Sequence, residues 1–436
     1  MPWQSTIYYR LATRPHLSYV ALMWQRTLNK SKGFWPEQYI LISGCLFLSS
    51  IGIGANMQYW ESQRRGANFF NEVETAERFQ SAKQNRIEIV RLVFNKWKAN
   101  RPQFKMGDFL FGSLDEFTTI VPDDLERLKS TLDTANRAGI KVVLSTLSLP
   151  GARWRQQNGN QLDLRLWKND SFHRSAAHFW KELARNLKNH PAIVGYNVVN
   201  EPYPEFASPR FLDWYSDDYE KWYQKIKGTA SDMNAFYKLV TSAIREEDRD
   251  TPIVLDSGFF ATPWAFKYLT PVADSKVLYS FHMYEPYAFT SHQNEGKFRY
   301  PGKAPIGEAD EAPLVHWDAK MLSQFLDPVR DWQKKWTMPS DRIFVSEFGL
   351  CRRNEGGAQY LKDLIAVFQK ENWHWAFYSF REDTWTGMDY ELGQDPLPPE
   401  YFEALELGKD IRQKFYKKNP LFDAIRAGLG EDKLGL

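Results

Sequence analysis

Two short motifs place a carboxylate directly behind an apolar run. Glu201 is the centre of an Asn-Glu-Pro motif after the run 193–199, and Glu347 belongs to a Ser-Glu-Phe-Gly motif after the run 343–345. Apolar runs of this kind predict strands, so each Glu follows a strand end. Two carboxyl groups about 5 Å apart can cleave a glycosidic bond, because one protonates the leaving oxygen while the other attacks the anomeric carbon. The alternative is two loop carboxylates that follow strands without a shared role.

The elements that would position these carboxylates recur along the chain. From about residue 66, near-continuous apolar segments alternate with amphipathic helical patterns such as 123–138 and 171–189, as in parallel sheets buried on both faces. We expect strands at 66–70, 87–94, 140–146, 193–199, 252–256, 277–283, 342–346 and 374–380. This order predicts an α/β fold, a single (β/α)8 TIM barrel with long βα loops over residues 60–428. A doubly wound sheet is the alternative, but no glycine-rich phosphate loop follows the first strand.

In such a barrel the fourth and seventh strands face each other, so Glu201 and Glu347 would converge at the carboxyl-terminal rim. The long connections 202–231, 284–316 and 381–400 rise from the same rim. We expect their aromatic residues to wall a cleft, because aromatic rings stack on the apolar faces of sugars. These residues are Trp214, Tyr215, Tyr219, Trp222, Tyr223, Tyr287, Phe298, Tyr300, Trp385 and Tyr390.

The pairing of Asn-Glu-Pro after the fourth strand with Ser-Glu-Phe-Gly after the seventh resembles glycoside hydrolase family 5. That family belongs to a clan of barrel glycosidases that carry both catalytic carboxylates at these strands. The resemblance covers about residues 60–425 of this chain. It implies that Glu201 is the acid/base and Glu347 the nucleophile, with Asn200 bonding the sugar 2-hydroxyl.

Three further residues fit this resemblance as substrate-binding or supporting groups. Arg91 puts a cation inside the second strand, where it needs an anion such as an ionised nucleophile; a structural ion pair is the alternative. His282 and Tyr284 alternate onto one face of the sixth strand. The family places a sugar-binding His and a Tyr that bonds the nucleophile in such a His-x-Tyr arrangement.

Two positions depart from the family pattern. Many members carry a His at the end of the third strand, where this chain has Leu147. Members commonly have a Trp at the end of the eighth strand, where this chain offers Tyr378, with Trp375 or Trp385 as substitutes. Both changes concern sugar contacts and leave the carboxylate pair intact, so they weaken the inference about the sugar rather than about the reaction.

We therefore expect a retaining glycoside hydrolase of the cellulase, β-glucanase or mannanase type, which cleaves a β-linked glucan or mannan by double displacement. The same residues could serve transglycosylation, and a non-catalytic polysaccharide-binding barrel of the cell envelope is a further alternative. We expect no cofactor and no metal: a metal-dependent barrel hydrolase would need a His-x-His on the first strand, where Asn68 stands. A net charge of +2 gives no indication of nucleic acid as a partner, and the sequence does not indicate an oligomeric state.

The amino-terminal region predicts export. Residues 39–55 form an uncharged apolar segment, and residues 1–38 before it carry basic residues with a single acid, Glu37. This is the pattern of a signal peptide or signal anchor. We expect a protein that is secreted, or held by this segment in a membrane, with its barrel on the periplasmic or extracellular side. A buried helix of the globular fold is the alternative.

Overall fold

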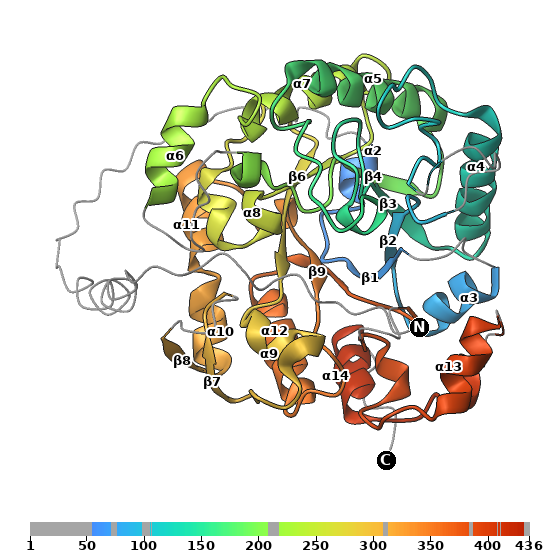
Figure 1. The fold of residues 1–436 in the computed structure, drawn as a ribbon, viewed down its shortest axis with the longest axis vertical. Helices are drawn as coiled ribbons and strands as arrows, with labels where there is room; N and C mark the ends of the chain where they lie inside the picture. Colours follow the sequence, from blue (N-terminus) through green and yellow to red (C-terminus); the bar gives the residue numbers. More distant parts are fainter. Residues whose placement is uncertain are drawn as a thin grey trace, which may run out of the picture.

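The computed structural model of the protein describes residues 55–70, 76–97, 105, 107–207, 218–307, 313–382, 387–407, 409 and 411–430. Eight parallel strands close a barrel in the order β1-β10-β9-β6-β5-β4-β3-β2 (Figure 1). They are β1 (Arg65–Phe69), β2 (Ile89–Val93), β3 (Lys141–Ser145), β4 (Ile193–Asn197), β5 (Ile253–Asp256), β6 (Val277–Met283), β9 (Ile343–Phe348) and β10 (His374–Phe377). Each lies within or next to a predicted segment, which confirms the (β/α)8 barrel.

Helices surround the barrel. The helices that cover its outside are α3 (Ala76–Gln84), α4 (Pro122–Arg137), α5 (Asp170–Leu187), α7 (Met233–Arg245), α10 (Ala319–Phe325), α11 (Asp327–Trp336), α12 (Gly357–Lys370) and α14 (Pro420–Gly428). Shorter or peripheral helices are α2 (Ala55–Gln58), α6 (Asp218–Ile226), α8 (Gly258–Ala261), α9 (Tyr287–Thr290) and α13 (Pro399–Glu406). The connection from β5 to β6 contains only α8 and the 3-10 helix Trp264–Tyr268, so this side of the barrel lacks a full outer helix among the described residues.

Local sequence explains where the predicted helices begin. α4 starts at Pro122, whose fixed φ suits a first helical turn, and Asp123 with Asp124 places negative charge at its positive end. In α5 the side chain of Asn169 accepts a hydrogen bond from the amide of Ser171. Both helices bury the apolar face that the spacing predicts, which presses them against the barrel.

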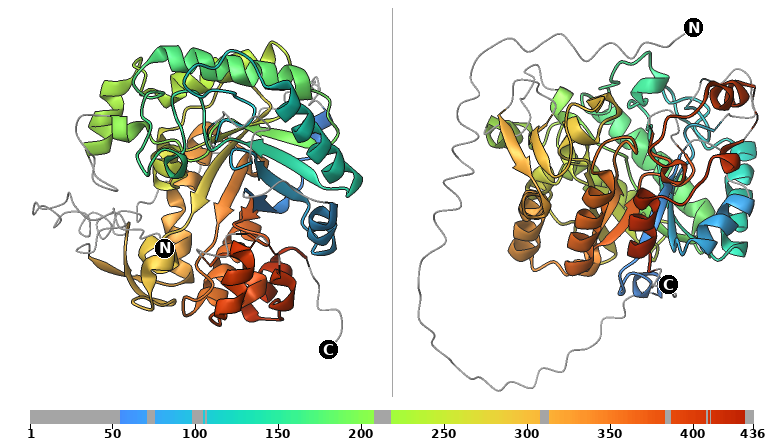
Figure 2. Two further views of the ribbon diagram at one scale, coloured as in Figure 1. Left: turned by 45° about the vertical axis from the view of Figure 1, so that its right-hand side comes forward. Right: turned by 90° about the horizontal axis from the view of Figure 1, so that it is seen from below.

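The lower end of the barrel is closed by an apolar plug. Met57 and Trp60, in and just after α2, pack on inward-facing strand residues, and the Trp60 indole donates to the carbonyl of Val194 at 2.9 Å. The strand residues in this layer are Ile89, Val143, Val194, Val254, Leu278, Phe344 and Ala376. In the right-hand view of Figure 2, α2 (blue) lies below the barrel, opposite the rim that bears the long loops. The segment before β1 is therefore part of the barrel core.

Most of the described aromatic residues of the long loops are buried, although the sequence predicts that they wall a cleft. Tyr219, Trp222, Tyr300 and Tyr390 are buried, whereas Tyr287 is exposed. Tyr223 and Phe298 are partly buried, and Trp214, Tyr215 and Trp385 lie outside the described residues. Tyr219, Trp222 and Tyr223 build a small core of their own, whereas Phe298, Tyr300 and Tyr390 pack in or on the main core, so these residues do not form an open wall.

The connection after β6 holds an antiparallel hairpin that the sequence patterns do not predict. Its strands are β7 (Gly302–Pro305) and β8 (Leu314–Trp317), and Lys303 stands opposite His316. Both strands are short and partly exposed, so they lack the apolar runs of the barrel strands. The hairpin stands on the same rim as the ends of the barrel strands (Figure 2, right).

The predicted signal or anchor segment 39–55 lies outside the described residues except for Ala55, which begins α2. Within the described parts of the chain, no helix combines the length and the apolar character needed to span a membrane.

Candidate active site

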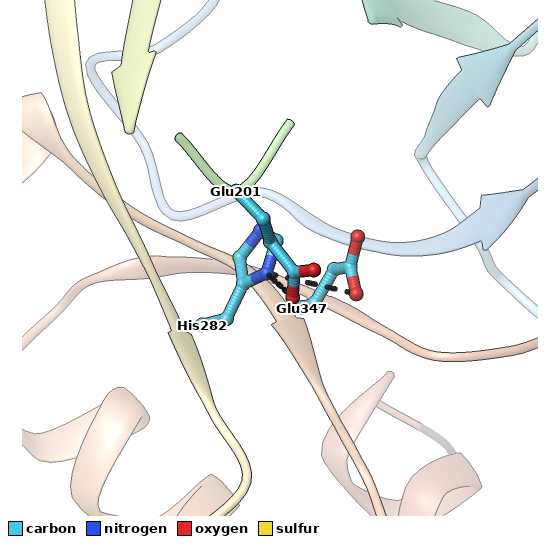
Figure 3. A group of neighbouring side chains, drawn as sticks. All are labelled: Glu201, His282 and Glu347. Carbon is cyan, nitrogen blue, oxygen red and sulfur yellow. Dashed lines mark hydrogen bonds and ion pairs between the residues drawn. The ribbon is translucent and has the colours of Figure 1, made fainter. Parts of the chain in front are cut away.

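Glu201 and Glu347 meet at the carboxyl-terminal rim of the barrel. Glu347 lies in β9, and Glu201 follows β4 with a left-handed φ of 49°. The amide of Glu201 donates to Asp256 Oδ2 at 3.4 Å, and the carbonyl of the next residue, Pro202, accepts from Phe260 at 3.0 Å. Glu201 and Glu347 each offer a carboxylate oxygen, and these two oxygens lie within 4.8 Å of each other and of a nitrogen of His282 (Figure 3). The structure thus brings together the two carboxylates that the motifs singled out.

Arg91 is fully buried between these groups. Its Nη1 contacts Glu347 Oε1 at 2.6 Å, and its Nη2 donates to Asn200 Oδ1 at 2.7 Å. Charge-assisted bonds of this length are strong, so the guanidinium fixes the Glu347 carboxylate. Because the oxygen of the Asn200 amide is occupied, its nitrogen is left to donate to a ligand hydroxyl. The predicted anion near Arg91 is therefore Glu347.

His282 and Tyr284 project from β6 and the residue just beyond it toward the same carboxylates. His282 Nδ1 lies 2.9 Å from Glu201 Oε1 and 3.7 Å from Glu347 Oε2. The Tyr284 hydroxyl donates to Glu347 Oε2 at 2.8 Å. Each oxygen of Glu347 thus has its own donor, one from Arg91 and one from Tyr284, which orients the carboxylate.

Asp256, at the end of β5, is a buried member of the site that the motif reading missed. Its Oδ1 accepts from Asn197 Nδ2 at 2.9 Å and from Ser280 Oγ at 2.8 Å. Its Oδ2 lies 3.7 Å from His282 Nε2. The signal was present, because Asp256 ends the apolar run of the fifth strand as Glu201 and Glu347 follow theirs. The residues that Asp256 contacts are set by the register of the neighbouring strands, which cannot be read from the sequence.

The surroundings shift the titration of three groups. Burial raises the pKa of Glu201, with an added contribution from the charge of Glu347, although His282 opposes both. Burial alone would lower the pKa of His282, but the carboxylates around it outweigh that effect and raise its pKa overall. Burial and the charge of Glu347 hold the pKa of Tyr284 well above its ordinary value. The site therefore favours a protonated Glu201 beside an imidazolium and a neutral phenol.

At the end of β10 the structure distinguishes the aromatic candidates. Tyr378 is partly buried, and its ring meets the edge of Phe70 with centroids 5.2 Å apart, in a cluster that includes Leu147. Trp375 is fully buried and packs against Phe348 in the core between the barrel and its helices. Trp375 is therefore wrong as a substitute for a sugar-contacting Trp, whereas Trp385 lies outside the described residues.

Glu201, His282 and Glu347 are also the group of described residues whose ligand atoms lie close enough to hold a metal ion. The atoms that would face the ion already have partners, because Arg91 and Tyr284 contact the two oxygens of Glu347 while His282 Nδ1 contacts Glu201 Oε1. A cation at this point would also face the Arg91 guanidinium. The donor set is thus satisfied by protein groups and fits proton transfer better than metal coordination.

Similarity to known proteins extends over most of the chain. The model of the cellulase family, glycosyl hydrolase family 5, matches residues 52–384. A β-xylosidase of Phanerodontia chrysosporium is 22% identical over 331 residues, which cover 70% of this chain and 60% of the xylosidase, so the chain spans less than two thirds of that relative. Endoglucanase C of Acetivibrio thermocellus is 19% identical over 299 residues, which cover 64% of this chain and 77% of that enzyme. The solved structure of endoglucanase Cel5A from Thermotoga maritima matches with a TM-score of 0.56 at 17% identity, over 85% of this chain and 99% of that one.

Proposed function

The chain belongs to glycosyl hydrolase family 5, and we propose that it is a retaining glycosidase that cleaves β-linked glucan or mannan chains by double displacement. The observation that carries this proposal is the approach of the Glu201 and Glu347 carboxylate oxygens to within 4.8 Å. Retaining enzymes hold their two carboxyl groups about 5–5.5 Å apart, whereas inverting enzymes need about 6.5–9.5 Å to admit a water.

In the first step Glu347 attacks the anomeric carbon and Glu201 donates its proton to the leaving oxygen. The bond to the leaving sugar breaks, and an ester forms between Glu347 and the remaining sugar. Arg91 and Tyr284 suit Glu347 to this role, since both donate to its carboxylate and fix its direction. Burial suits Glu201 to the acid role because it favours the protonated carboxyl.

In the second step Glu201 accepts a proton from water, which attacks the ester and releases the sugar with its original configuration. The change of role follows from charge. The Glu347 carboxylate raises the pKa of Glu201, and this contribution disappears once Glu347 is esterified. The ionised form of Glu201, which is the form that can act as a base, is then favoured at the moment when a base is needed.

The test combines stereochemistry with two substitutions. We expect proton NMR to show the β-anomer as the first product released from a β-glycan. Glu347→Gln should abolish turnover of every substrate, whereas Glu201→Ala should retain activity toward aryl glycosides with dinitrophenol as the leaving group, which needs little acid assistance. Glu246→Gln, on an exposed side chain, is the matched control and should behave as the wild type. Release of the α-anomer, or wild-type activity in both active-site variants, would refute the proposal.

We further propose that residues 39–55 direct the protein for export and hold it at a membrane. The uncharged segment with basic residues before it supports this placement. A truncation that begins at residue 52 retains α2 and its plug residues, so it should fold and move from the membrane fraction to the soluble fraction. If the full chain is itself found in the soluble fraction at its full length, the anchor is wrong.

A further inference from the structure

A polar cavity lies apart from the carboxylate pair, beside the β7–β8 hairpin. It has a volume of about 440 Å³. Its walls come from residues 296–303, from β8 and from the loop after β9. We call it the basic rim pocket, and the residues that define its chemistry are Lys297, Phe298, Arg299, Lys303, His316 and Glu355.

The backbone that presents these side chains is held from both sides. Asn294 donates to the Phe298 carbonyl at 2.8 Å and accepts from the Phe298 amide at 2.7 Å. The Tyr300 amide donates to the Glu355 carbonyl at 3.1 Å, and its hydroxyl donates to Asp363 at 2.6 Å. The inward residues Phe298 and Tyr300 thus fix the segment, while the residues between and beside them project outward. Such preorganisation lowers the entropic cost of binding a ligand.

The outward residues give the pocket a positive charge. Lys297, Arg299 and Lys303 are cationic, and the carboxylate in the lining is Glu355, 3.7 Å from Arg299. Lys303 makes no ion pair with a carboxylate of the described residues and stands opposite His316 in the hairpin. Even without Lys297, the two cations Arg299 and Lys303 outnumber the one carboxylate of the described lining, which suits a carboxylate, sulfate or phosphate group.

The pocket is also connected to the catalytic residues through two strands. One wall belongs to the loop that starts beyond Tyr284, and the other to the loop after Glu347. The amide of Cys351 in the second loop donates to the carbonyl of Thr290 in the first at 2.7 Å. The pocket and the carboxylate pair therefore stand on the same two βα connections. An anionic sugar at the cleavage point would face Glu201 and Glu347, so a separate basic pocket suits a substituent placed elsewhere on the chain.

We propose that the basic rim pocket binds an anionic substituent of a β-linked polysaccharide, which makes an acidic glycan the preferred ligand. This inference rests on the proposed glycosidase function for the identity of the polymer. The charge of the pocket supplies the selectivity.

The test measures binding rather than turnover. Native electrophoresis of the full chain in gels that contain carboxymethyl cellulose or hydroxyethyl cellulose compares an acidic and a neutral form of one polymer. We expect tighter binding to the carboxymethyl form and an affinity about tenfold lower in the double variant Arg299→Gln, Lys303→Gln. Its affinity for the hydroxyethyl form should not change. The control Lys238→Gln, Lys370→Gln removes two exposed charges elsewhere and should bind both polymers as the wild type does.

Equal retention of the wild type in both gels, or an unchanged affinity of the Arg299/Lys303 variant, would overturn the proposal. A binding experiment with inorganic phosphate distinguishes a free anion from an anion carried by the polysaccharide. If phosphate binds to the wild type but not to the variant while the two polymers bind equally, the pocket serves a free anion and the polysaccharide is excluded as the carrier. Selective binding without hydrolysis of any β-glycan would refute the glycosidase function alone. Hydrolysis without selective binding would refute the pocket alone.

Discussion

Two layers of the barrel interior lie two residues apart on the same strands and differ in the polarity of their side chains. The lower residue of each pair is apolar and the upper one is polar: Ile89 and Arg91 on β2, Val143 and Ser145 on β3, Val254 and Asp256 on β5, Leu278 and Ser280 on β6, and Phe344 and Ser346 on β9. All of them are buried. The lower layer is stabilised by removal of apolar surface from water, whereas the upper layer depends on a complete set of hydrogen bonds.

Within one barrel, the lower layer therefore contributes mainly to stability, and the upper layer contributes to the chemistry of the site. An apolar layer tolerates the loss of a small group, because the free energy of unfolding falls only by the burial of that group and by the cost of the cavity left behind. A buried polar layer does not, because removing one partner leaves another unpaired. Changes in the upper layer should therefore reduce activity and stability together, and changes in the lower layer should reduce stability alone.

The largest effect is expected for Arg91→Met in the upper layer. It leaves the Glu347 carboxylate without its cation and strips partners from Asn197 and Asn200. We expect kcat to fall by about 10³-fold or more and the free energy of unfolding by about 3–5 kcal/mol. Steady-state kinetics and urea unfolding measure the two losses. Arg185→Met removes an exposed ion pair with Glu247 and should leave both the free energy of unfolding and kcat close to those of the wild type.

Trp60→Ala tests the lower layer. It removes the largest side chain of the plug and its hydrogen bond to Val194, so the free energy of unfolding should fall by about 3–5 kcal/mol. The kcat of the folded fraction should stay within about twofold of the wild type, because no group of the carboxylate site is touched. A loss of kcat comparable with that of Arg91→Met, in protein shown to be folded, would mean that the two layers are not separable.

Tyr284→Phe sharpens the comparison with one hydroxyl group. It removes the donor to Glu347 Oε2, and a hydrogen bond to a charged group is worth about 1.5–3 kcal/mol, or about 10- to 100-fold in kcat/KM. Tyr196→Phe is the matched control, since it removes a bond of 3.0 Å to Asp248 outside the carboxylate site. The control should lose stability with unchanged kcat/KM. Equal kinetic losses in both variants would contradict a specific role for Tyr284.

Among the variants at the carboxylate site, Asp256→Asn should have the smallest effect on the maximal rate, and its effect should appear in the pH dependence of the rate. Burial lowers the pKa of His282, whereas Glu347 and then Glu201 raise it, and the Asp256 carboxylate, 3.7 Å from His282 Nε2, adds a smaller contribution in the same direction. Without this charge the His282–Glu201 pair releases its last proton at lower pH. The alkaline limb of the kcat/KM profile should therefore move to lower pH. A limb that stays in place, or moves to higher pH, would show that Asp256 does not act through His282.

The sequence allowed the barrel and its central pair to be predicted for one physical reason. Parallel strands buried on both faces need near-continuous apolar runs, and a carboxylate such as Glu201 or Glu347 at the end of a run interrupts that pattern. Arg91 was identifiable in the same way, as a charge inside an apolar strand. Residues of this kind stand out against their neighbours without knowledge of their contacts.

Other features depended on three-dimensional packing. The contact of Asp256 with His282 follows from the pairing of β5 with β6, and the burial of Tyr219 and Trp222 follows from the way α6 packs on the loop after β5. Trp375 and Tyr378 lie three residues apart, yet one is in the core and the other is partly exposed beside Phe70. Composition gives the number of aromatic residues but does not show which rings lie in the core and which lie at the rim of the barrel.

The most direct measurement of the central claim is the identity of the residue that forms the covalent intermediate. The enzyme would be incubated with a 2-deoxy-2-fluoro β-cellobioside that carries a dinitrophenol leaving group, digested, and analysed by mass spectrometry. The account predicts a stoichiometric label on Glu347, with slow reactivation as the ester hydrolyses. A label on another residue would contradict it, as would the absence of any label in enzyme that hydrolyses the unfluorinated glycoside.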